Sequence, residues 1–571
     1  MTRKRHEREE EGNGLRELGR VMPPSEFYQP APCLDNQYEA DSLLRGYLAW
    51  RVPAPMLRAL HSELGRFGER VVTDIAALGR AAEAQPPRLV PYDAWGRRID
   101  DIVVSDAWRE LDRISAVEGL VAIAYERANG ELSRVHQMAK LYLFHPSSST
   151  YSCPLAMGDG AARFLEVHGD ERTRNAFEHL TTRDPARFWT SGQWMTERTG
   201  GSDVSATSTI ARPGESAGVA SGAEPYRLFG TKWFTSATTS QMAIALARID
   251  GAPAGGRGLS AFLVELRDAT GALRGIRVNR LKDKLGTRAL PTAELTLDGA
   301  PGTLVGGAGD GVRKIASMFN VTRVYNAVAA VAGMRRAIVL AQDYATKRMA
   351  FGKPLIEQPL HRETLADLDA VERGCFLLAF HAVELLGKEE CGTATERDLG
   401  VLRLLTPVVK LYTAKHAVGV ASEALEAFGG AGYIEDTGIP QLLRDAQVLP
   451  IWEGTTNVLS LDVLRAIERT DAWTAWRTDI ELRLDAIDQP SLVGAVEQIR
   501  ARIEALARSM QAARDASTLE TNARRIAFAI AHVSASARLA EYALWSATHP
   551  AGAHDAAAAA DSLTRWLASS S

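Results

Sequence analysis

The sequence predicts an α+β fold in which an N-terminal helical domain, a middle β domain and a C-terminal four-helix bundle follow one another, with an additional helical segment after the bundle. Apolar residues recur at helical spacing before about residue 190 and again after about residue 311. Between these parts Gly, Ser and Thr are dense, and short alternating runs indicate strands. The 571 residues leave room for roughly three or four domains.

The expected domain boundaries follow these changes of pattern. Residues 1–40 are expected to be a mobile N-terminal arm ending in the Pro-rich segment PPSEFYQPAP. Helical periodicity marks residues 41–190 as the N-terminal helical domain, and alternating runs mark residues 191–305 as the β domain. Long helical runs with short connections within residues 306–470 favour an antiparallel bundle. Residues 471–571 are Ala-rich and form the additional helical segment.

The composition predicts a soluble intracellular protein, most simply a cytoplasmic one. The formal net charge of −4 favours neither nucleic acid nor an acidic membrane as partner. The four cysteines are scattered, which argues against a disulfide framework or a metal site. No run reaches the ~18 apolar residues of a membrane span. The charged N-terminus lacks the apolar region of a secretory signal, and its acidic residues are atypical of a mitochondrial transit peptide.

The segment LPIWEGTTN at residues 449–457 places one carboxylate, Glu453, after two large apolar side chains. Desolvation disfavours the charged form of a carboxylate, which suits a general base. The following glycine lets a ligand or another backbone come close, and Thr455 and Asn457 offer polar groups. The alternative is an ordinary turn with a solvated glutamate, and these residues alone favour that alternative.

Two motifs lie in the predicted β domain. In MTERTGGSDV at residues 195–204, paired glycines expose backbone N–H groups and Thr196 and Ser202 add hydroxyls, as a loop that holds phosphate or a heterocycle would require. Most such segments are only turns. In KWFTS at residues 232–236, an aromatic pair followed by hydroxyls suits the wall of a flat-ring site. A plain strand with core aromatics explains it equally.

Two further motifs lie in the predicted bundle. RMAFGKP at residues 348–354 closes a helix, and Arg348 suits bidentate phosphate binding. A basic helix end favoured by the macrodipole, followed by a Gly-Lys-Pro stop, explains it equally. The three glycines of FGGAGY at residues 428–433 permit close backbone approach, or only a cap and a turn. The order of the four motifs, together with Glu453, is more specific than any one of them.

In this order the motifs resemble those of the acyl-CoA dehydrogenase family of flavoproteins, over roughly residues 41–465. The AidB-like branch of that family is the most similar, because Arg198-Thr199 replaces the usual Pro-Gly and the chain continues into an extra helical segment. Three more stretches carry the resemblance: LKDKLGTR at 281–288, FNVTR at 319–323 and LLRDAQVLPIWEGTTN at 442–457.

The resemblance implies that FAD lies between the β domain and the bundle of a homo-oligomer, expected to be a tetramer. It implies that Glu453 is the catalytic base, that Arg198 and Arg323 lie near the substrate, and that no metal is needed. Arg348 and Phe351 would reach FAD of the neighbouring subunit. The residues implied to contact FAD are Met195, Thr196, Gly201, Ser202, Trp233, Phe234, Thr235, Arg348, Phe351, Gly430, Thr455 and Asn457. Glu426, Pro359 and Asn320 depart from the usual pattern, so contacts there are expected to be rearranged.

The activity implied is FAD-dependent α,β-desaturation of an acyl-CoA thioester, in fatty acid metabolism, with an electron-transfer flavoprotein or oxygen as electron acceptor. Three alternatives remain: an AidB-like flavoprotein that binds nucleic acid or protects against alkylation, an acyl-CoA oxidase, and a lipid-binding protein with vestigial activity. A nucleic-acid role requires a basic surface. Residues 471–571 carry ten arginines, no lysine and twelve acidic residues, a net charge of −2, so the dehydrogenase is favoured.

Overall fold

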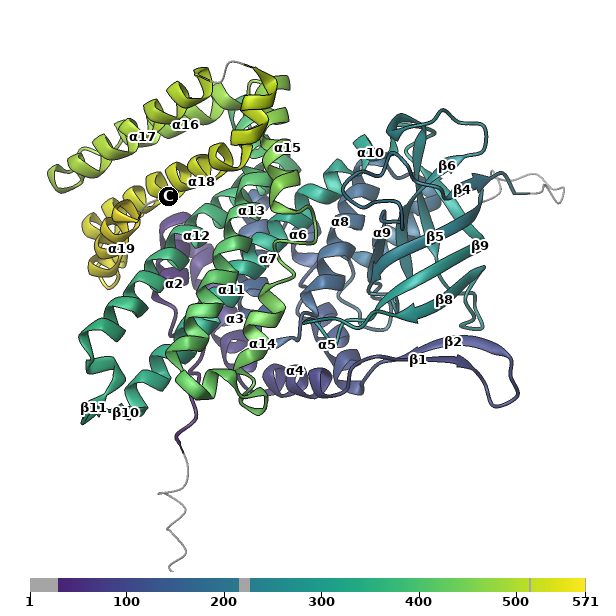
Figure 1. Cartoon of the computed structure of the whole chain (residues 1–571), viewed down its shortest axis with the longest axis horizontal. Coiled ribbons are helices and arrows are strands. Elements are labelled where there is room, and N and C mark those ends of the chain that lie inside the picture. The colour runs from purple at the N-terminus through teal and green to yellow at the C-terminus, as the bar shows by residue number, and fades with distance from the viewer. Residues whose placement is uncertain (1–28, 215–225, 513–514, 570–571) are drawn as a thin grey trace, which may run out of the picture.

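The computed structural model describes residues 29–214, 226–512 and 515–569, and it confirms the predicted fold class (Figure 1). In Figure 1 the β domain lies at the right, the bundle and the additional C-terminal helices lie at the left, and the N-terminal helices extend from the left to the middle, where α8 and α9 lie beside the β domain. One large apolar core joins the helical parts, while smaller cores lie on the two sides of the sheet.

The N-terminal part is helical, with one β-hairpin. Its elements are α2 (Ser42–Arg51), α3 (Ala54–Arg70), α4 (Asp74–Ala84), β1 (Arg88–Tyr92), β2 (Arg98–Val103), α5 (Asp106–Val117), α6 (Ala122–Glu126), α7 (Ser133–Phe144), α8 (Ser152–His168) and α9 (Glu171–Leu180). Side chains begin several helices, since Asp41 accepts from the N–H of Leu44 and Ser105 from that of Trp108. Helix α7 is buried on every face, because it runs through the middle of the core.

The β domain is a sheet of seven strands in the described part of the chain. They are β3 (Ser191–Trp194), β4 (Ile210–Arg212), β5 (Tyr226–Ser236), β6 (Met242–Ile249), β7 (Leu259–Glu265), β8 (Ile276–Leu281) and β9 (Thr292–Val305). Six of them lie in the order β3-β6-β4-β5-β9-β7, β8 pairs with β9 beside this path, and additional pairing of β6 with β7 closes the sheet on itself. Asp298-Gly299, a pair typical of turns, is an irregularity within β9, where Gly299 has φ +80° and the register with β5 shifts.

The hairpin β1–β2 is a departure from the mainly α interpretation of residues 41–190. It reaches over to the edge strand β8, where Arg98 donates to the carbonyl of Val278 at 2.9 Å and Asp100 accepts from its N–H at 3.0 Å. Trp95 at the hairpin tip is 94% exposed. The strands therefore show no clean apolar/polar alternation, and the sequence pattern gave no strand signal.

The bundle is built on three helices of more than 30 residues. Its elements are α10 (Gly311–Lys314), α11 (Ala316–Lys347), β10 (Met349–Ala350), β11 (Lys353–Pro354), α12 (Pro359–Cys391), α13 (Glu396–Ala427), α14 (Ile439–Ala446) and α15 (Thr456–Arg469). Helix α11 is long and apolar enough to cross a membrane by length and composition alone, but 78% of that stretch is buried inside the structure. It is the central helix of the bundle.

The additional C-terminal segment packs on the bundle rather than standing apart. It consists of α16 (Ala472–Asp485), α17 (Val493–Gln511), α18 (Ala516–Thr548) and α19 (Ala556–Ala568). Glu384 of α12 pairs with Arg51 of α2 at 2.8 Å and with Arg538 of α18 at 3.4 Å. Asp555, before α19, pairs with Arg373 of α12 at 2.8 Å. Buried ion pairs thus join the first helices, the bundle and the last helices.

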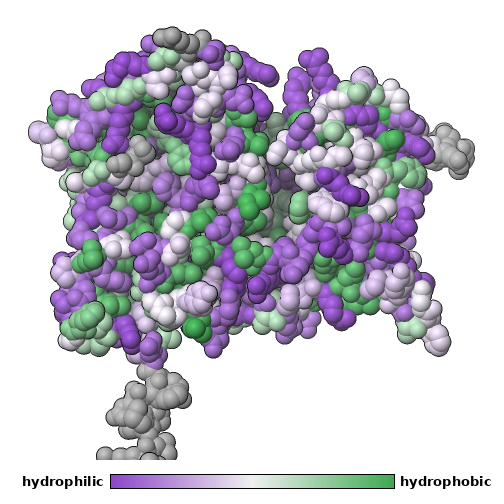
Figure 2. Space-filling view, viewed as in Figure 1, coloured by the Kyte–Doolittle hydropathy of each residue, from purple (hydrophilic) through white to green (hydrophobic). Residues whose placement is uncertain are grey.

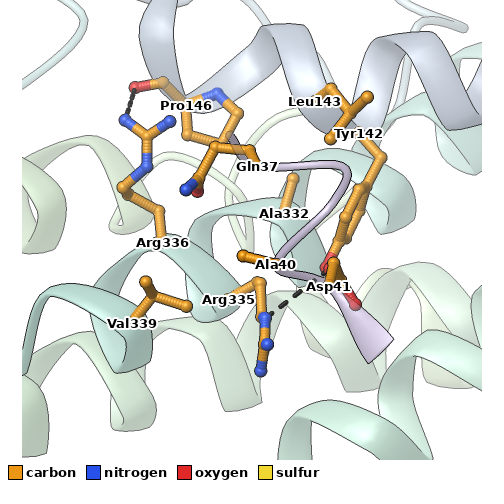
Figure 3. A pocket seen from close by; sticks show the side chains of 10 residues that line it. All are labelled: Gln37, Ala40, Asp41, Tyr142, Leu143, Pro146, Ala332, Arg335, Arg336 and Val339. Carbon is orange, nitrogen blue, oxygen red and sulfur yellow. Dashed lines mark hydrogen bonds and ion pairs between the residues drawn. The ribbon is translucent and has the colours of Figure 1, made fainter. Parts of the chain in front are cut away.

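The structure corrects part of the mobile arm expected for residues 1–40. The first 28 residues lie outside the described part, but residues 29–40 are docked on the bundle. Tyr38 is fully buried, and the N–H of Cys33 donates to Asp343 of α11 at 2.7 Å. Gln37, Ala40 and Asp41 line a cavity of about 20 Å³ against α7 and α11. Figure 3 shows these side chains, with Asp41 paired to Arg335, at a distance of 3.5 Å. A cavity of that size holds about one water molecule.

Candidate active site

Glu453 lies in the turn between α14 and α15, with its backbone in the left-handed region. Its φ is +57°, and that of Gly454 is +103°. A residue other than glycine in this region costs of order 1–3 kcal/mol and persists only where its surroundings hold it. Such strain is frequent at functional sites, and here it falls on the one residue that the sequence analysis assigned as the base.

Three side chains from the bundle hold this turn. The hydroxyl of Thr322 on α11 donates to Oε2 of Glu453 at 2.6 Å. The ammonium of Lys410 on α13 donates to the carbonyl of the next residue at 2.6 Å. The indole N–H of Trp452 donates to the side-chain oxygen of Asn326 on α11. The carboxylate is therefore placed by two rigid helices as well as by its own turn.

The turn has one packed side and one open side. Trp452 packs against the large core, whereas Ile451, expected as an apolar neighbour of the base, points outward and is 61% exposed. Thr455 and Asn457 are exposed in the first turn of α15. Glu453 itself is half-buried. Polar groups and the base therefore share the open side, where a ligand can reach them.

Two basic side chains, Lys410 and Arg323, lie near the base. Lys410 is fully buried, and this burial lowers its pKa to about 7 although Glu453 acts in the opposite direction. Arg323, expected near the substrate, pairs with Asp462 of α15 at 2.9 Å. The same Asp462 pairs with Arg403 of α13, also at 2.9 Å. The guanidinium of Arg323 is thus held against α15 by a shared carboxylate.

The first β-domain motif and the aromatic motif lie side by side. The N–H of Trp233 donates to the carbonyl of Thr196 at 3.0 Å. A Cβ atom at Gly201 would lie 3.0 Å from the Thr196 side chain, so a glycine lets the loop fold back onto that residue. Met195 is buried beneath the loop, whereas Ser202 is exposed. The structure therefore brings together the residues expected to contact the flavin ring.

The aromatic pair is not part of a strand core. Trp233 is half-buried and Phe234 is 57% exposed. The ammonium of Lys282 lies 3.7 Å from the ring centre of Trp233, and the guanidinium of Arg198 lies 5.6 Å from it. The hydroxyl of Thr235 donates to a neighbouring backbone carbonyl at 2.8 Å, which leaves its oxygen only as an acceptor. An exposed aromatic wall fits a flat-ring site better than a plain strand does.

A buried ion pair anchors the loop below this wall. Glu197 lies 2.8 Å from the ammonium of Lys232 and accepts hydrogen bonds from Ser208 and Thr209. Burial opposes ionisation of Glu197, but the ammonium and the hydroxyls outweigh it and lower its pKa to about 2. The loop that carries Thr196 and Gly201 is therefore fixed before any ligand binds.

The other expected FAD contacts lie at the far tip of the bundle. Arg348 and Gly430 line a cavity of about 750 Å³ together with His361 and Glu426. Nε2 of His361 is buried there without a hydrogen-bond partner among the described residues. Phe351, between β10 and β11, is 97% exposed at φ +52°. Figure 1 shows this tip at the end of the bundle away from the β domain, so one chain does not unite the two groups of residues.

These observations fit FAD. The 750 Å³ cavity offers a guanidinium, glycine backbone and an unpartnered imidazole nitrogen, which suit a nucleotide with phosphates. The exposed aromatic wall on the β domain suits a flat ring. Figure 2 shows a hollow between the helical part and the β domain. The β-domain residues and the bundle-tip residues lie apart within one chain. This separation is expected if a neighbouring subunit contributes residues to each FAD site.

Four residues around the base turn were not predicted as site residues from the sequence: Thr322, Asn326, Lys410 and Asp462. Thr322 lies inside the FNVTR motif, but its side-chain target is 131 residues away in sequence. Lys410 had a weak signal, because it is a single lysine within the apolar helical run TPVVKLY. Long-range contacts of this kind follow from the tertiary structure and leave little trace in local periodicity.

Known proteins match the whole described architecture. Residues 192–300 match the family model described as acyl-CoA dehydrogenase, middle domain, and residues 309–468 match acyl-CoA dehydrogenase, C-terminal domain. Residues 29–184 match the adaptive response protein AidB N-terminal domain. Residues 471–570 match the acyl-CoA dehydrogenase 11 C-terminal domain-like model. The chain belongs to the acyl-CoA dehydrogenase family, a family of FAD-dependent oxidoreductases.

Individual relatives agree with this membership. Acyl-CoA dehydrogenase family member 11 of Caenorhabditis elegans is 44% identical over 90% of this chain and 86% of its own length. AidB of Escherichia coli is 32% identical over 78% of this chain and 80% of its own length. The solved structure of Caenorhabditis elegans ACDH-11 in complex with C11-CoA has a TM-score of 0.91 and 41% identity, and covers 97% of this chain and 94% of that one.

Proposed function

We propose that this protein desaturates acyl-CoA thioesters between the α and β carbons, with Glu453 as the base. The observation that supports the proposal most is the left-handed turn at Glu453, held by Thr322 and Lys410 with polar groups on its open side. A solvated turn glutamate needs neither backbone strain nor anchors from two helices. The arrangement instead suits a carboxylate whose position matters.

The chemistry requires a positioned base. The α C–H of a thioester is weakly acidic, so its removal depends on a carboxylate within reach and on stabilisation of the charge that develops on the thioester oxygen. Glu453 would accept the α-proton on a carboxylate oxygen, and the hydroxyl of Thr322 would orient that carboxylate. FAD supplies the acceptor for the β-hydride, a redox step that side chains do not perform.

We assign the cofactor contacts in two groups. Thr196, Trp233 and Phe234 would face the ring, with Gly201 and Ser202 near the phosphates, because they form one exposed surface on the β domain. Met195 and Thr235 would support that surface from below. Thr455 and Asn457 would hold FAD beside the base.

The second group would come from another subunit. Arg348, Phe351 and Gly430 would contact FAD of a neighbouring copy, because they lie at the tip of the bundle, away from the residues proposed to face the flavin ring. This assignment makes the protein a homo-oligomer, for which a tetramer of paired dimers is the arrangement we propose.

The substrate proposed is a fatty acyl-CoA of medium or greater chain length. The Caenorhabditis elegans relative whose structure holds C11-CoA covers nearly the entire chain, including the C-terminal segment. Arg198, exposed over the ring of Trp233, is placed to influence substrate entry. Electrons would then pass to an electron-transfer flavoprotein or, in an oxidase, to oxygen.

Anaerobic titration of the purified, FAD-loaded protein with acyl-CoAs from four to eighteen carbons tests the proposal. Bleaching of the flavin absorbance by chains near eleven carbons, and formation of the enoyl-CoA, are expected. Non-oxidisable thioether analogues are the control, because they should bind without bleaching. Absence of bleaching with every acyl-CoA, despite bound FAD, would contradict the proposed activity and favour a binding protein. Sustained turnover with oxygen as the sole acceptor would indicate an oxidase, whereas turnover that requires an electron-transfer flavoprotein would indicate a dehydrogenase.

A further inference from the structure

We infer that Lys410 is a positioning residue for the base, acting through the carbonyl of Gly454; this inference rests on the proposed function. Lys410 lies in the middle of α13 and is fully buried. Its ammonium donates to the Gly454 carbonyl at 2.6 Å. In the part of the chain that the structure describes, no carboxylate lies within ion-pair distance of this ammonium.

Burial without an ion pair makes this lysine unusual. Lysine is almost never fully buried unless it is paired, because the charged form loses its hydration. Other buried lysines of this chain follow the rule: Lys140 contacts Glu63 and Glu118, and Lys232 contacts Glu197. An apolar residue on this face of α13 would pack without that cost. The lysine is therefore best explained by the Gly454 carbonyl, the one hydrogen-bond acceptor of its ammonium among the described residues.

The position of the Gly454 carbonyl determines where the carboxylate of Glu453 points. The carbonyl belongs to Gly454, whose φ of +103° follows the left-handed Glu453. A Cβ atom at Gly454 would lie 2.9 Å from the Leu459 side chain, so this peptide is confined on one side by α15 and on the other by the ammonium. With the carbonyl fixed, the preceding residue cannot relax into an ordinary conformation. Its carboxylate is then held where Thr322 reaches it.

The two anchors act on different atoms. Thr322 contacts the carboxylate itself, from α11, whereas Lys410 contacts the backbone beyond it, from α13. Loss of the backbone anchor should turn the carboxylate away from its productive direction, while the proposed FAD contacts on the β domain and at the tip of the bundle persist. A misplacement of about 1 Å can cost ~10²-fold in rate.

The test compares Lys410→Met with wild type in three measurements: FAD content, acyl-CoA affinity and the rate of flavin reduction in single-turnover stopped flow. We expect normal FAD content, affinity within about threefold, and reduction slowed by roughly 10–100-fold. Lys410→Gln, which keeps an N–H donor on a shorter neutral chain, should be slowed less and serves if the methionine variant does not fold. Lys140→Met is the matched control, since it removes a buried ammonium far from the turn and should change stability but not the reduction rate.

A double variant separates positioning from a general structural effect. If Lys410 acts through Glu453, then Lys410→Met should add no further slowing to Glu453→Gln. Wild-type reduction by FAD-loaded Lys410→Met, or equal slowing in both backgrounds, would overturn the inference while leaving the base assignment intact. Wild-type reduction by Glu453→Gln would instead overturn the proposed function itself.

Discussion

Backbone conformation, rather than residue type, distinguishes Glu453 from the other glutamates in the described part of the chain. Its positive φ is stabilised from outside the turn, by a hydroxyl to the carboxylate and an ammonium to the next carbonyl. Local strain that is held by contacts distant in sequence is typical of a position whose geometry serves a function. At the scale of single residues, the function therefore depends on the partners of Glu453 as much as on the carboxylate.

Thr322→Val tests the closer of these partners. Valine has nearly the shape of threonine but lacks the hydroxyl that donates to Glu453 at 2.6 Å. We expect flavin reduction to slow by roughly three- to thirtyfold, about the effect of one charge-assisted hydrogen bond, with unchanged FAD content. Stopped-flow absorbance at saturating acyl-CoA measures the rate of flavin reduction. Thr413→Val is the control, because Thr413 is a buried threonine on α13 whose hydroxyl donates only to its own helix. Equal rates in Thr322→Val and wild type would contradict the orienting role.

At the scale of elements, the tip between α11 and α12 combines exposed aromatic surface with a polar cavity. The exposed Phe351 stands beside a cavity lined by Arg348 and Gly430. The glycine motif also has a plain structural role, since a Cβ atom at Gly432 would lie 2.0 Å from the carbonyl of Leu425. The motif thus ends α13 with a turn at Gly432, and Gly430 lines the cavity.

Arg348→Ala should lower FAD content more than it lowers the thermal stability of the apoprotein. Arg348 lines the large cavity, where a guanidinium suits phosphate, and an exposed arginine contributes little to folding. The measurement is the ratio of flavin to protein absorbance after dialysis against FAD of decreasing concentration. Arg397→Ala, at an exposed arginine of α13, is the control. Equal FAD retention in both variants would favour a plain helix end.

At the scale of the whole molecule, the C-terminal segment is part of the folded unit. Its buried apolar residues belong to the same core as the bundle, and Arg538 and Asp555 pair with residues of α12. Five of its arginines pair with carboxylates: Arg477, Arg483, Arg500, Arg538 and Arg565. Because carboxylates neutralise these five arginines, the described part of the segment carries less free positive charge than its arginine content suggests.

Duplex DNA should therefore bind weakly at most, with a strong dependence on salt. The net charge of residues 471–571 is −2, and most of their described arginines are already paired. Fluorescence titration of a labelled duplex at 50 mM and 200 mM salt measures the affinity and its salt slope. Tight binding that persists at the higher salt concentration would contradict the assignment and promote the AidB-like nucleic-acid role.

The fold was largely predictable from the sequence, whereas the anchoring of the site was not. Helical periodicity located the three long bundle helices within a few residues, because each has apolar positions over many turns. The hairpin β1–β2 was missed because its tip is exposed and does not alternate. The docking of residues 29–40 was missed because extended segments have no period. Thr322 and Lys410 could not be assigned, because their partners lie 131 and 44 residues away.

The central claim is that Glu453 removes the α-proton, and Glu453→Gln tests it most directly. Glutamine keeps the size of the side chain but removes the basic oxygen, while the residues assigned to FAD are unchanged. We predict normal FAD content, normal acyl-CoA binding, and substrate-driven flavin reduction slowed by at least ~10²–10⁴-fold. Glu453→Asp should be intermediate, because it keeps a base on a shorter chain. Reduction of FAD-loaded Glu453→Gln at the wild-type rate in stopped flow would contradict the account.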